Sequence, residues 1–256
     1  MRDFAYQSAA IADAEMRKVL RDPTELLSRA VQPVLWLAVF GQVFSRVRGI
    51  PTGALSYLDY MAPGILAQSI LFSAIFYGIA VIWERDLGIV HKLLVTPAYR
   101  SALVMGKAFA AGMRGLLQAA VVYGVAAALN VGIRWEFGPI LVVAAAAFVG
   151  SCLFSTFSLV IACIVKTRER FMGIGQLLTM PLFFASNAIY PIDLMPGWLK
   201  VIAAVNPLTY LVDALRGAMV VGGENVYAQS TSFGVLLLTF AILLAAAAKL
   251  YPGLAR

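Results

Sequence analysis

The sequence contains little charge. Asp, Glu, Lys and Arg make up 13% of its 256 residues, whereas 61% are hydrophobic. A water-soluble domain needs far more charge to cover its surface. The two cysteines, Cys152 and Cys163, both fall within one apolar stretch, so no disulfide framework is expected. The scarcity of charge excludes a soluble protein and indicates a chain that spans a membrane several times.

Motifs for several kinds of chemistry are also missing. The sequence has no GxxxxGK[ST] loop to hold nucleotide phosphates, no HExxH and no GxSxG. Its single histidine, His91, has no Cys or carboxylate at metal-ligand spacing, so we expect no metal site and no catalytic residue. Carboxylates within the apolar stretches, which an ion-coupled carrier would need, are lacking away from their ends. The energy for any transport must therefore come from a partner.

What the sequence does have is a succession of long apolar stretches. Each is near or above the roughly 20 residues that cross a bilayer as a helix. They are Pro23–Phe44, Tyr57–Trp83, Ala102–Asn130, Gly138–Val165, Phe171–Ile189 and Ser232–Leu250. We therefore expect an all-α, polytopic membrane protein with six transmembrane helices in a single domain, residues 1–256.

The net charge of +7 is unevenly distributed along these six spans. If the N-terminus is cytoplasmic, fifteen Lys and Arg residues lie on the cytoplasmic side and five lie outside. This bias follows the positive-inside rule and predicts that both termini are cytoplasmic. The excess positive charge is thus explained by the membrane, and no nucleic-acid partner is expected.

Residues 1–21 have the pattern of an amphipathic helix on the cytoplasmic membrane surface. Phe4, Ile11 and Met16 share one side, while Asp13 points away. Glu15 falls on the apolar side, which this interpretation does not explain. A frayed, solvated terminus remains the alternative.

Residues 84–100 form a charged interruption between the second and third spans. The segment consists of a charged start (Glu84, Arg85 and Asp86), a close-approach point (Gly88), an apolar ridge (Ile89, Val90, Leu93 and Leu94) and a stop (Thr96 and Pro97). We expect a short cytoplasmic helix whose exposed apolar ridge docks on a partner or lies on lipid.

Residues 190–230 are long and apolar for an outside loop. Their prolines and glycines predict two short helices, Trp198–Val205 and Pro207–Val221, that dip part-way into the outer leaflet. Asn206 is expected to cap the second helix. Asp213 and Arg216 stand three residues apart and can pair, which would reduce the cost of charge at membrane depth.

Uncharged polar and aromatic side chains occur within the spans, where they bond to other helices or line a path. The candidates for a translocation path are Gln68, Phe72, Phe76, Tyr77, Gln118, Phe183 and Phe184. Lys107 and Arg114 share one face of the third span. These two cations either snorkel to lipid phosphates or line an inner vestibule.

Two stretches of the sequence carry a resemblance to a known family. Glu84-Arg-Asp-Leu-Gly88, with the following Leu-Leu-Val-Thr-Pro97, resembles the coupling-helix signature of type-2 ABC exporter permeases. Tyr190-Pro-Ile-Asp-Leu-Met-Pro-Gly-Trp198, with Asn206-Pro-Leu-Thr-Tyr210 and Asp213-Ala-Leu-Arg216, resembles that family's second signature. The chain departs from the family pattern at Ile89 and His91, where Thr and Glu are usual.

The resemblance implies a permease subunit of an ATP-driven exporter in the cytoplasmic membrane of a prokaryote. Its cargo would be a hydrophobic or amphipathic drug, lipid or lipid-linked or other polysaccharide. Two ABC ATPase subunits, which bind ATP and Mg, would drive two permease subunits: this chain and a second copy or a close relative. This chain itself would bind no cofactor.

The resemblance also assigns roles to the two segments. Residues 84–100 would be the ATPase-coupling helix, and residues 190–230 would be re-entrant helices that form an extracellular gate. The gate residues would be Pro191, Trp198, Asn206, Pro207, Tyr210, Asp213 and Arg216. A membrane-embedded enzyme of lipid metabolism and an ion-coupled carrier remain the alternatives, although the sequence lacks the clustered or mid-span ionisable residues that they need.

Overall fold

The structure is a computed structural model that describes residues 2–21, 31–46, 53, 55–96, 99–165 and 167–255. Helices dominate this part of the chain, and a lone antiparallel bridge joins Ile133 to Val220. The elements are α1 (Arg2–Arg21), η1 (Trp36–Gly41), α3 (Gln42–Arg46), α4 (Tyr57–Asp86), α5 (Ile89–Val95), α6 (Arg100–Ala128), α7 (Phe137–Ile164), α8 (Arg168–Phe184), η2 (Ile192–Leu194), α9 (Gly197–Val205), α10 (Pro207–Met219), α11 (Gln229–Leu250) and η3 (Tyr251–Ala255).

Four helices, α4, α6, α7 and α11, are long and apolar enough to cross a membrane. The bent pair of α9 and α10, which meet at 81°, would make a fifth span if counted as one. The expected number of six is therefore not confirmed within the described residues.

Two expected spans are not among these helices, for different reasons. The expected span Phe171–Ile189 corresponds to α8, which has 17 residues, begins in the charged run Arg168-Glu169-Arg170 and ends at Phe184. The first expected span, Pro23–Phe44, begins outside the described residues, and its described part is the apolar helix Val31–Phe44.

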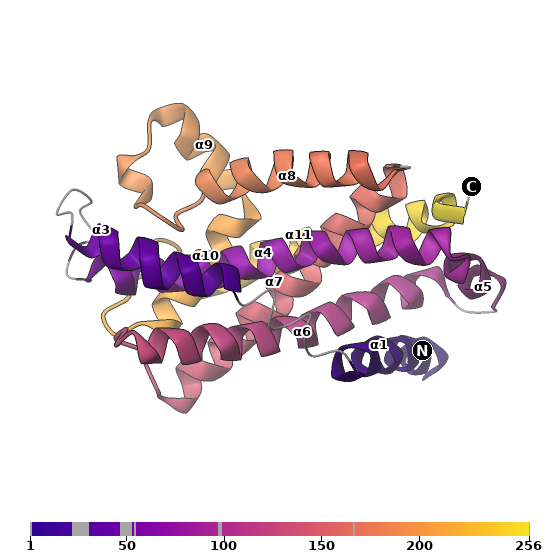
Figure 1. Cartoon of the computed structure of the whole chain (residues 1–256), viewed down its shortest axis with the longest axis horizontal. Helices are drawn as coiled ribbons and strands as arrows, with labels where there is room; N and C mark the ends of the chain where they lie inside the picture. Colours follow the sequence, from indigo (N-terminus) through magenta and orange to yellow (C-terminus); the bar gives the residue numbers. More distant parts are fainter. Residues whose placement is uncertain are drawn as a thin grey trace.

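The long helices pack around α7, which contacts α4, α6, α10 and α11 (Figure 1). Small residues allow α6 and α7 to approach closely. A Cβ at Gly115 would collide with the Ser151 side chain, so a larger residue there would separate the two helices. The core of the molecule therefore lies where α4, α6, α10 and α11 meet α7.

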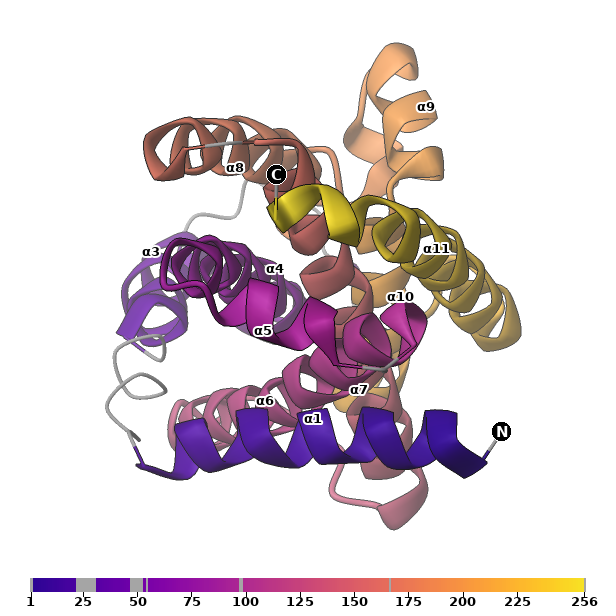
Figure 2. The same ribbon diagram turned by 90° about the vertical axis from the view of Figure 1, so that its right-hand side faces the viewer.

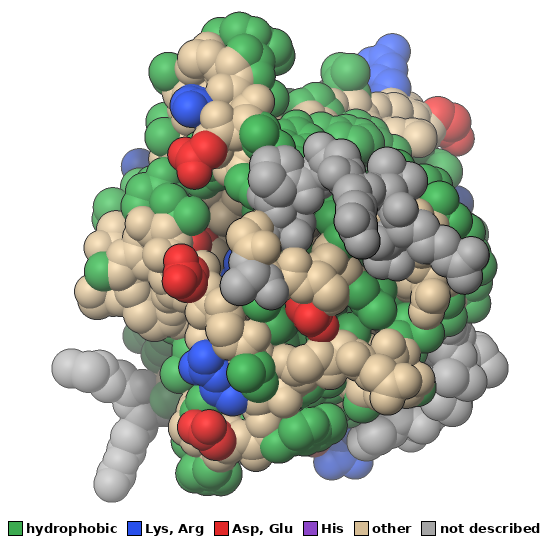
Figure 3. All heavy atoms as spheres, turned by 90° about the vertical axis from the view of Figure 1, so that its left-hand side faces the viewer, with side chains coloured by type: hydrophobic (Ala, Val, Ile, Leu, Met, Phe, Trp, Pro, Cys, Tyr) green, Lys and Arg blue, Asp and Glu red, His purple; other side chains and the backbone are tan. Residues whose placement is uncertain are grey.

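The bundle has two different ends. α1, α5 and the C-terminal η3 gather at one end, which we call the α5 end (Figure 1). Figure 2 looks onto this end and shows α1 lying across the bundle, whereas α4 runs away from the viewer. The opposite end, near α9, carries charged side chains scattered among hydrophobic ones (Figure 3). The expected helix over residues 1–21 is present as α1, and it packs on α6.

The short helix α10 is buried on nearly every side between α4, α7 and α11. The Asn206 side chain accepts a hydrogen bond from the Leu208 amide at 3.0 Å, with Pro207 in the first turn, so the expected cap is confirmed. α10 ends at Met219, two residues before the expected Val221. It stops there because Val220 is extended and pairs with Ile133.

Candidate functional site

The segment expected to be one coupling helix contains a turn. α4 continues through Asp86, and α5 comprises only the seven residues Ile89–Val95. Gly88 separates them with φ of +72°, a conformation that side-chain-bearing residues rarely adopt. A Cβ on Gly88 would meet no atom within 4 Å. This glycine is therefore needed for its backbone conformation, and no other part of the described chain lies close to it.

The apolar ridge of this segment faces the protein's own core. Val90 is 0% exposed, and Leu93 and Leu94 are half-buried against a cluster that includes Leu103 and Tyr251. Thr96 ends the helix by donating its hydroxyl to the Leu93 carbonyl at 2.6 Å. The expectation that Val90, Leu93 and Leu94 form an exposed ridge was therefore wrong, because the ridge anchors α5 to the bundle.

A different set of side chains points outward from this segment. Val95 is 86% exposed and Leu87 is 66% exposed, and Ile89 is also exposed. His91 and Lys92 are exposed on the same helix. We call Leu87 of the preceding turn, together with Ile89, His91, Lys92 and Val95 of α5, the outer face of α5. Another expected coupling residue, Pro97, lies outside the described residues.

Glu84, in the last turn of α4, points into the molecule. One of its carboxylate oxygens lies 2.6 Å from Lys107 Nζ of α6, and the other lies 2.7 Å from Lys18 Nζ of α1. Asp86 turns the other way and contacts Arg168 at 2.7 Å and Arg85 at 2.9 Å. The two carboxylates of the motif therefore bind different parts of the chain.

Glu15 of α1 joins the same group of charges. Its carboxylate lies 3.2 Å from Lys107 and 3.0 Å from both Arg114 and Lys18. Burial raises the pKa of Glu15, but the facing cations outweigh that effect and lower the pKa to about 2. We call Glu15, Lys18, Glu84, Lys107 and Arg114 the coupling-end cluster.

This cluster explains features that the sequence left open. Glu15 stands on the apolar side of its helix because its partners are buried there. Lys107 is 1% exposed and ion-paired. The two expectations for Lys107, that it snorkels to lipid phosphates or lines an inner vestibule, were therefore wrong. In the sequence, the sign of this cluster is Glu15, a carboxylate on the apolar side of its helix. The sequence does not identify the residues that Glu15 binds.

Four of the seven expected path residues line two separate hollows in the structure. Phe72 and Phe76 line a groove of about 230 Å³ between α4 and α8. The other lining residues are Ile75, Ile79, Met172, Gln176, Thr179 and Met180. The groove is open to the outside of the chain and is mainly apolar, with an amide and a hydroxyl from α8.

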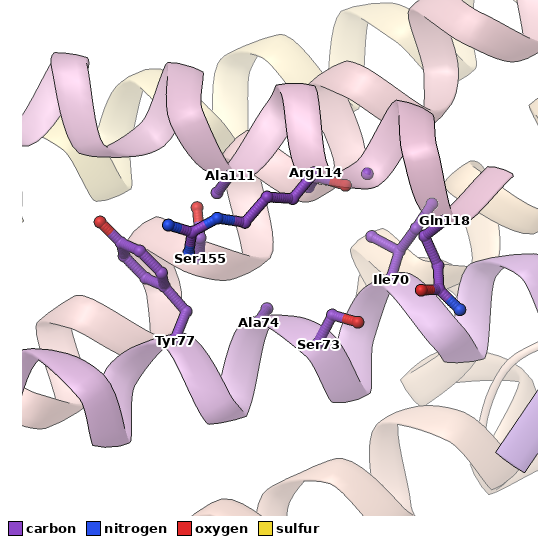
Figure 4. A pocket seen from close by; sticks show the side chains of 10 residues that line it. Ile70, Ser73, Ala74, Tyr77, Ala111, Arg114, Gln118 and Ser155 are labelled. Carbon is purple, nitrogen blue, oxygen red and sulfur yellow. The ribbon is translucent and has the colours of Figure 1, made fainter. Parts of the chain in front are cut away.

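A second, inner cavity lies between α4, α6 and α7 (Figure 4). It has a volume of about 20 Å³, which suits a water molecule but not a cargo. The Arg114 side chain reaches toward Tyr77 and Ser155, while Gln118 lies at the far end of the cavity. Tyr77 and Gln118 are thus separated from the groove, although the sequence grouped them with Phe72 and Phe76.

The other expected path residues lie outside both hollows. Gln68 is buried within α4. Phe183 is buried against Trp36, with ring centroids 6.0 Å apart. Phe184 is half-exposed at the end of α8.

Two expected gate residues, Asp213 and Arg216, do not pair with each other. Asp213 accepts hydrogen bonds from the Val226 amide at 2.7 Å and from the Tyr227 amide at 3.1 Å. It also accepts one from the Ser232 hydroxyl at 3.4 Å. The expected ion pair was therefore wrong, because the loop before α11 occupies the carboxylate.

Arg216 is held on the other side of α10. Its guanidinium donates to the Asn187 carbonyl at 2.6 Å and to the Tyr60 carbonyl at 3.3 Å. It also lies 3.8 Å from the centre of the Tyr60 ring. We call Asp213 and Arg216, with these partners, the α10 cluster.

The remaining expected gate residues surround the corner between α9 and α10. Asn206 donates to the Leu182 carbonyl at 2.7 Å, and the Tyr210 hydroxyl donates to the Ala204 carbonyl at 2.7 Å. Trp198 of α9 is exposed, and Pro191 precedes η2. The corner is therefore fixed by Asn206 and Tyr210, whereas Trp198 is accessible from outside the chain.

Known proteins resemble this chain over most of its length. Residues 6–220 match the family model described as ABC-2 type transporter. The chain is 30% identical to a putative transport permease, ycf38, of Cyanophora paradoxa, over 77% of this chain and 68% of that protein. It is 23% identical to a probable doxorubicin resistance ABC transporter permease protein, DrrC, of Mycobacterium tuberculosis, over 100% of this chain and 90% of that one. It is 26% identical to nodulation protein J of Rhizobium leguminosarum bv. viciae, over 82% and 80%.

Proposed function

Because the chain belongs to the ABC-2 type transporter family, and is thus a permease subunit of an ABC exporter, we propose that it carries an amphipathic cargo along the groove between α4 and α8. The groove supports this proposal by its chemistry. Apolar and aromatic side chains favour a hydrophobic body, and the exposed Gln176 amide offers hydrogen bonds to a polar part. Drugs and lipid-linked glycans share this amphipathic character.

A separate ABC ATPase supplies the energy and docks on the outer face of α5. The observation that carries this proposal is the exposure of Val95 and Leu87 beside the charged Lys92, at the end of a helix whose inner side is anchored. Exposed apolar side chains rimmed by polar ones are typical of protein interfaces. The ATPase binds ATP and Mg, and this chain binds neither.

The working complex contains two ATPase subunits and two permease subunits, the second being another copy of this chain or a close relative. The α5 end and both termini face the cytoplasm of a prokaryote, and the protein lies in the cytoplasmic membrane. The distribution of Lys and Arg supports this orientation. The α9 corner, with Trp198 and the Asn206 cap, lies on the outer side and acts as the gate.

A charge placed on the outer face of α5 tests the docking. Val95→Asp is expected to weaken ATPase binding by about 30-fold or more, because an unpaired carboxylate at an interface is costly. The matched control is Val221→Asp, which places the same charge on an exposed valine distant in sequence from α5. Leu93 and Leu94 would not serve, because they are half-buried and their substitution would disturb folding.

The readouts are co-purification of the ATPase and ATP-dependent accumulation of doxorubicin in inside-out vesicles. Val95→Asp should weaken co-purification and transport together, and Val221→Asp should preserve co-purification of the ATPase. If the ATPase binds Val95→Asp as tightly as the unmodified chain, docking on this face is wrong. If the unmodified complex hydrolyses ATP without accumulating doxorubicin, this drug is not a cargo, and a lipid-linked glycan becomes the next probe of the groove.

A further inference from the structure

α1 is fixed to α6 along several turns. The Gln7 side chain accepts a hydrogen bond from the Tyr99 amide at 3.1 Å. Further along, a Cβ at Gly106 would lie 2.6 Å from the Ser8 carbonyl oxygen and 2.7 Å from Ile11 Cβ. The absence of a side chain at Gly106 therefore lets the two helices touch. α1 is part of the packed body at this end of the molecule.

The coupling-end cluster then connects α1 to the start of the coupling turn. Glu84 lies four residues before Gly88, and its two carboxylate oxygens are occupied by Lys107 of α6 and Lys18 of α1. Glu15 binds the same Lys107 from α1. Lys107 is thus shared by carboxylates from two elements, and removing either one weakens the neutralisation of a buried cation.

Asp86 makes a separate connection in the same turn. Its carboxylate binds Arg168, and the Arg168 guanidinium lies 3.6 Å from the centre of the Trp83 ring. Arg168 is the first residue of α8, which lines the groove. Glu84 and Asp86 therefore lead to different helices, although they are two residues apart.

We propose that Glu84 and Lys107 are positioning residues that make α1 and the α5 end move as one body, so that a push on α5 also displaces α1. The proposal rests on the proposed docking of an ATPase on α5. It gives Glu84 an internal role, because both of its oxygens are bound within the chain and it is not available for an ATPase contact. Asp86 carries the same push to α8 and the groove.

Hydrogen–deuterium exchange with mass spectrometry tests this proposal on the permease–ATPase complex in nanodiscs. Glu84→Gln, a change on α4, should speed amide exchange in α1 by about ten-fold or more, because it frees one attachment of that helix. Trapping the ATPase with ATP and vanadate should change exchange in both α5 and α1 of the unmodified complex. In Glu84→Gln the same trapping should change α5 but not α1.

Asp86→Asn is the matched control, since it alters a carboxylate in the same turn. It should speed exchange at the start of α8 and leave α1 unchanged. If Glu84→Gln destabilises the whole chain, Glu84→Gln combined with Lys107→Met removes the unpaired buried cation. The double variant should regain the thermal stability of the unmodified complex while α1 still fails to respond to trapping.

The outcomes separate the two proposals. If α1 in Glu84→Gln exchanges and responds to trapping as in the unmodified complex, the positioning role is wrong. If amide exchange in α1 changes equally in Asp86→Asn, the proposal that Glu84 and Asp86 act on different helices is wrong. If α5 of the unmodified complex does not respond to trapping, docking on α5 has failed. The faster exchange of α1 in the isolated Glu84→Gln permease then still tests the connection itself.

Discussion

Within its described residues the protein buries charge in two places and satisfies it in two different ways. In the coupling-end cluster, side chains from α1, α4 and α6 neutralise one another, with Lys107 between Glu15 and Glu84. In the α10 cluster, Asp213 and Arg216 each bind backbone groups of other segments and do not pair. The first arrangement joins helices to one another, whereas the second fixes irregular segments and the first turn of α4, at Tyr60, to one helix.

This difference follows from what the neighbouring segments offer. The turn after α8 and the loop before α11 have backbone carbonyls and amides that no helix satisfies, and charged side chains bind such groups strongly. At the α5 end, by contrast, the partners belong to regular helices whose backbone groups are mostly bonded already, and Arg114 reaches the Glu15 backbone carbonyl only at 3.4 Å. Opposite charges are then the available partners. The α10 cluster should therefore matter most for stability, and the coupling-end cluster for communication between helices.

The largest effect is expected in the α10 cluster. Asp213→Leu should lower the free energy of unfolding by about 3–5 kcal/mol, because it leaves the Val226 and Tyr227 amides without an acceptor. Asp213→Asn keeps one acceptor oxygen and should cost about 1–2 kcal/mol. SDS unfolding titrations in detergent measure both. Equal losses for the two variants would show that the charge matters and the hydrogen bonds do not.

Double-mutant cycles give a smaller and more specific effect. The pair Glu84→Gln and Lys107→Met should show a coupling energy of about 1–3 kcal/mol, because the two side chains are in direct contact. The pair Asp213→Asn and Arg216→Gln should show a smaller coupling energy, because the two charges lie on one helix but each is bound mainly to backbone groups. The same SDS titrations measure both cycles. A large coupling energy for the second pair would remove the distinction between the clusters.

The two clusters also show how far the sequence could lead. Composition and apolar length predicted an all-helical membrane protein, and local chemistry predicted the Asn206 cap. The coupling signature marked the segment at Glu84 but gave the wrong inner and outer faces, because Val90 and Leu93 pack against residues distant in the sequence. Periodicity shows that a helix has two faces, and tertiary contacts decide which face is buried.

The partners of the buried charged residues could not be predicted from the sequence, for a related reason. Spacing suggested that Asp213 and Arg216 pair, but spacing on one helix cannot account for competing backbone groups from residues 187 and 226. The Lys107–Glu15 contact crosses 92 residues of chain. Its only local sign was a carboxylate on the apolar side of residues 1–21. A residue that contradicts its own helix pattern was here the best indicator of a distant partner.

The smallest effect is expected in the response of the coupling-end cluster to pH between pH 8 and pH 5. Lys18, Lys107 and Arg114 lower the pKa of Glu15 from 4.5 to about 2, so the folded state favours the ionised carboxylate. This preference corresponds to about 3 kcal/mol, which is fully present above pH 4.5 and is lost as the pH falls toward 2. Hydrogen exchange in α1, corrected for its intrinsic pH dependence, should therefore show the same protection at pH 8 and pH 5.

Glu15→Gln supplies the control for this response, because it cannot ionise. Its α1 should be less protected at pH 7, and the difference from the unmodified chain should shrink as the pH falls below 4.5, where the unmodified Glu15 also begins to lose its advantage. A loss of α1 protection already between pH 8 and pH 5 in the unmodified chain would mean that Glu15 is not held by these three cations. The coupling-end cluster would then resemble the α10 cluster, with α1 held by backbone contacts such as that of Gln7 with Tyr99.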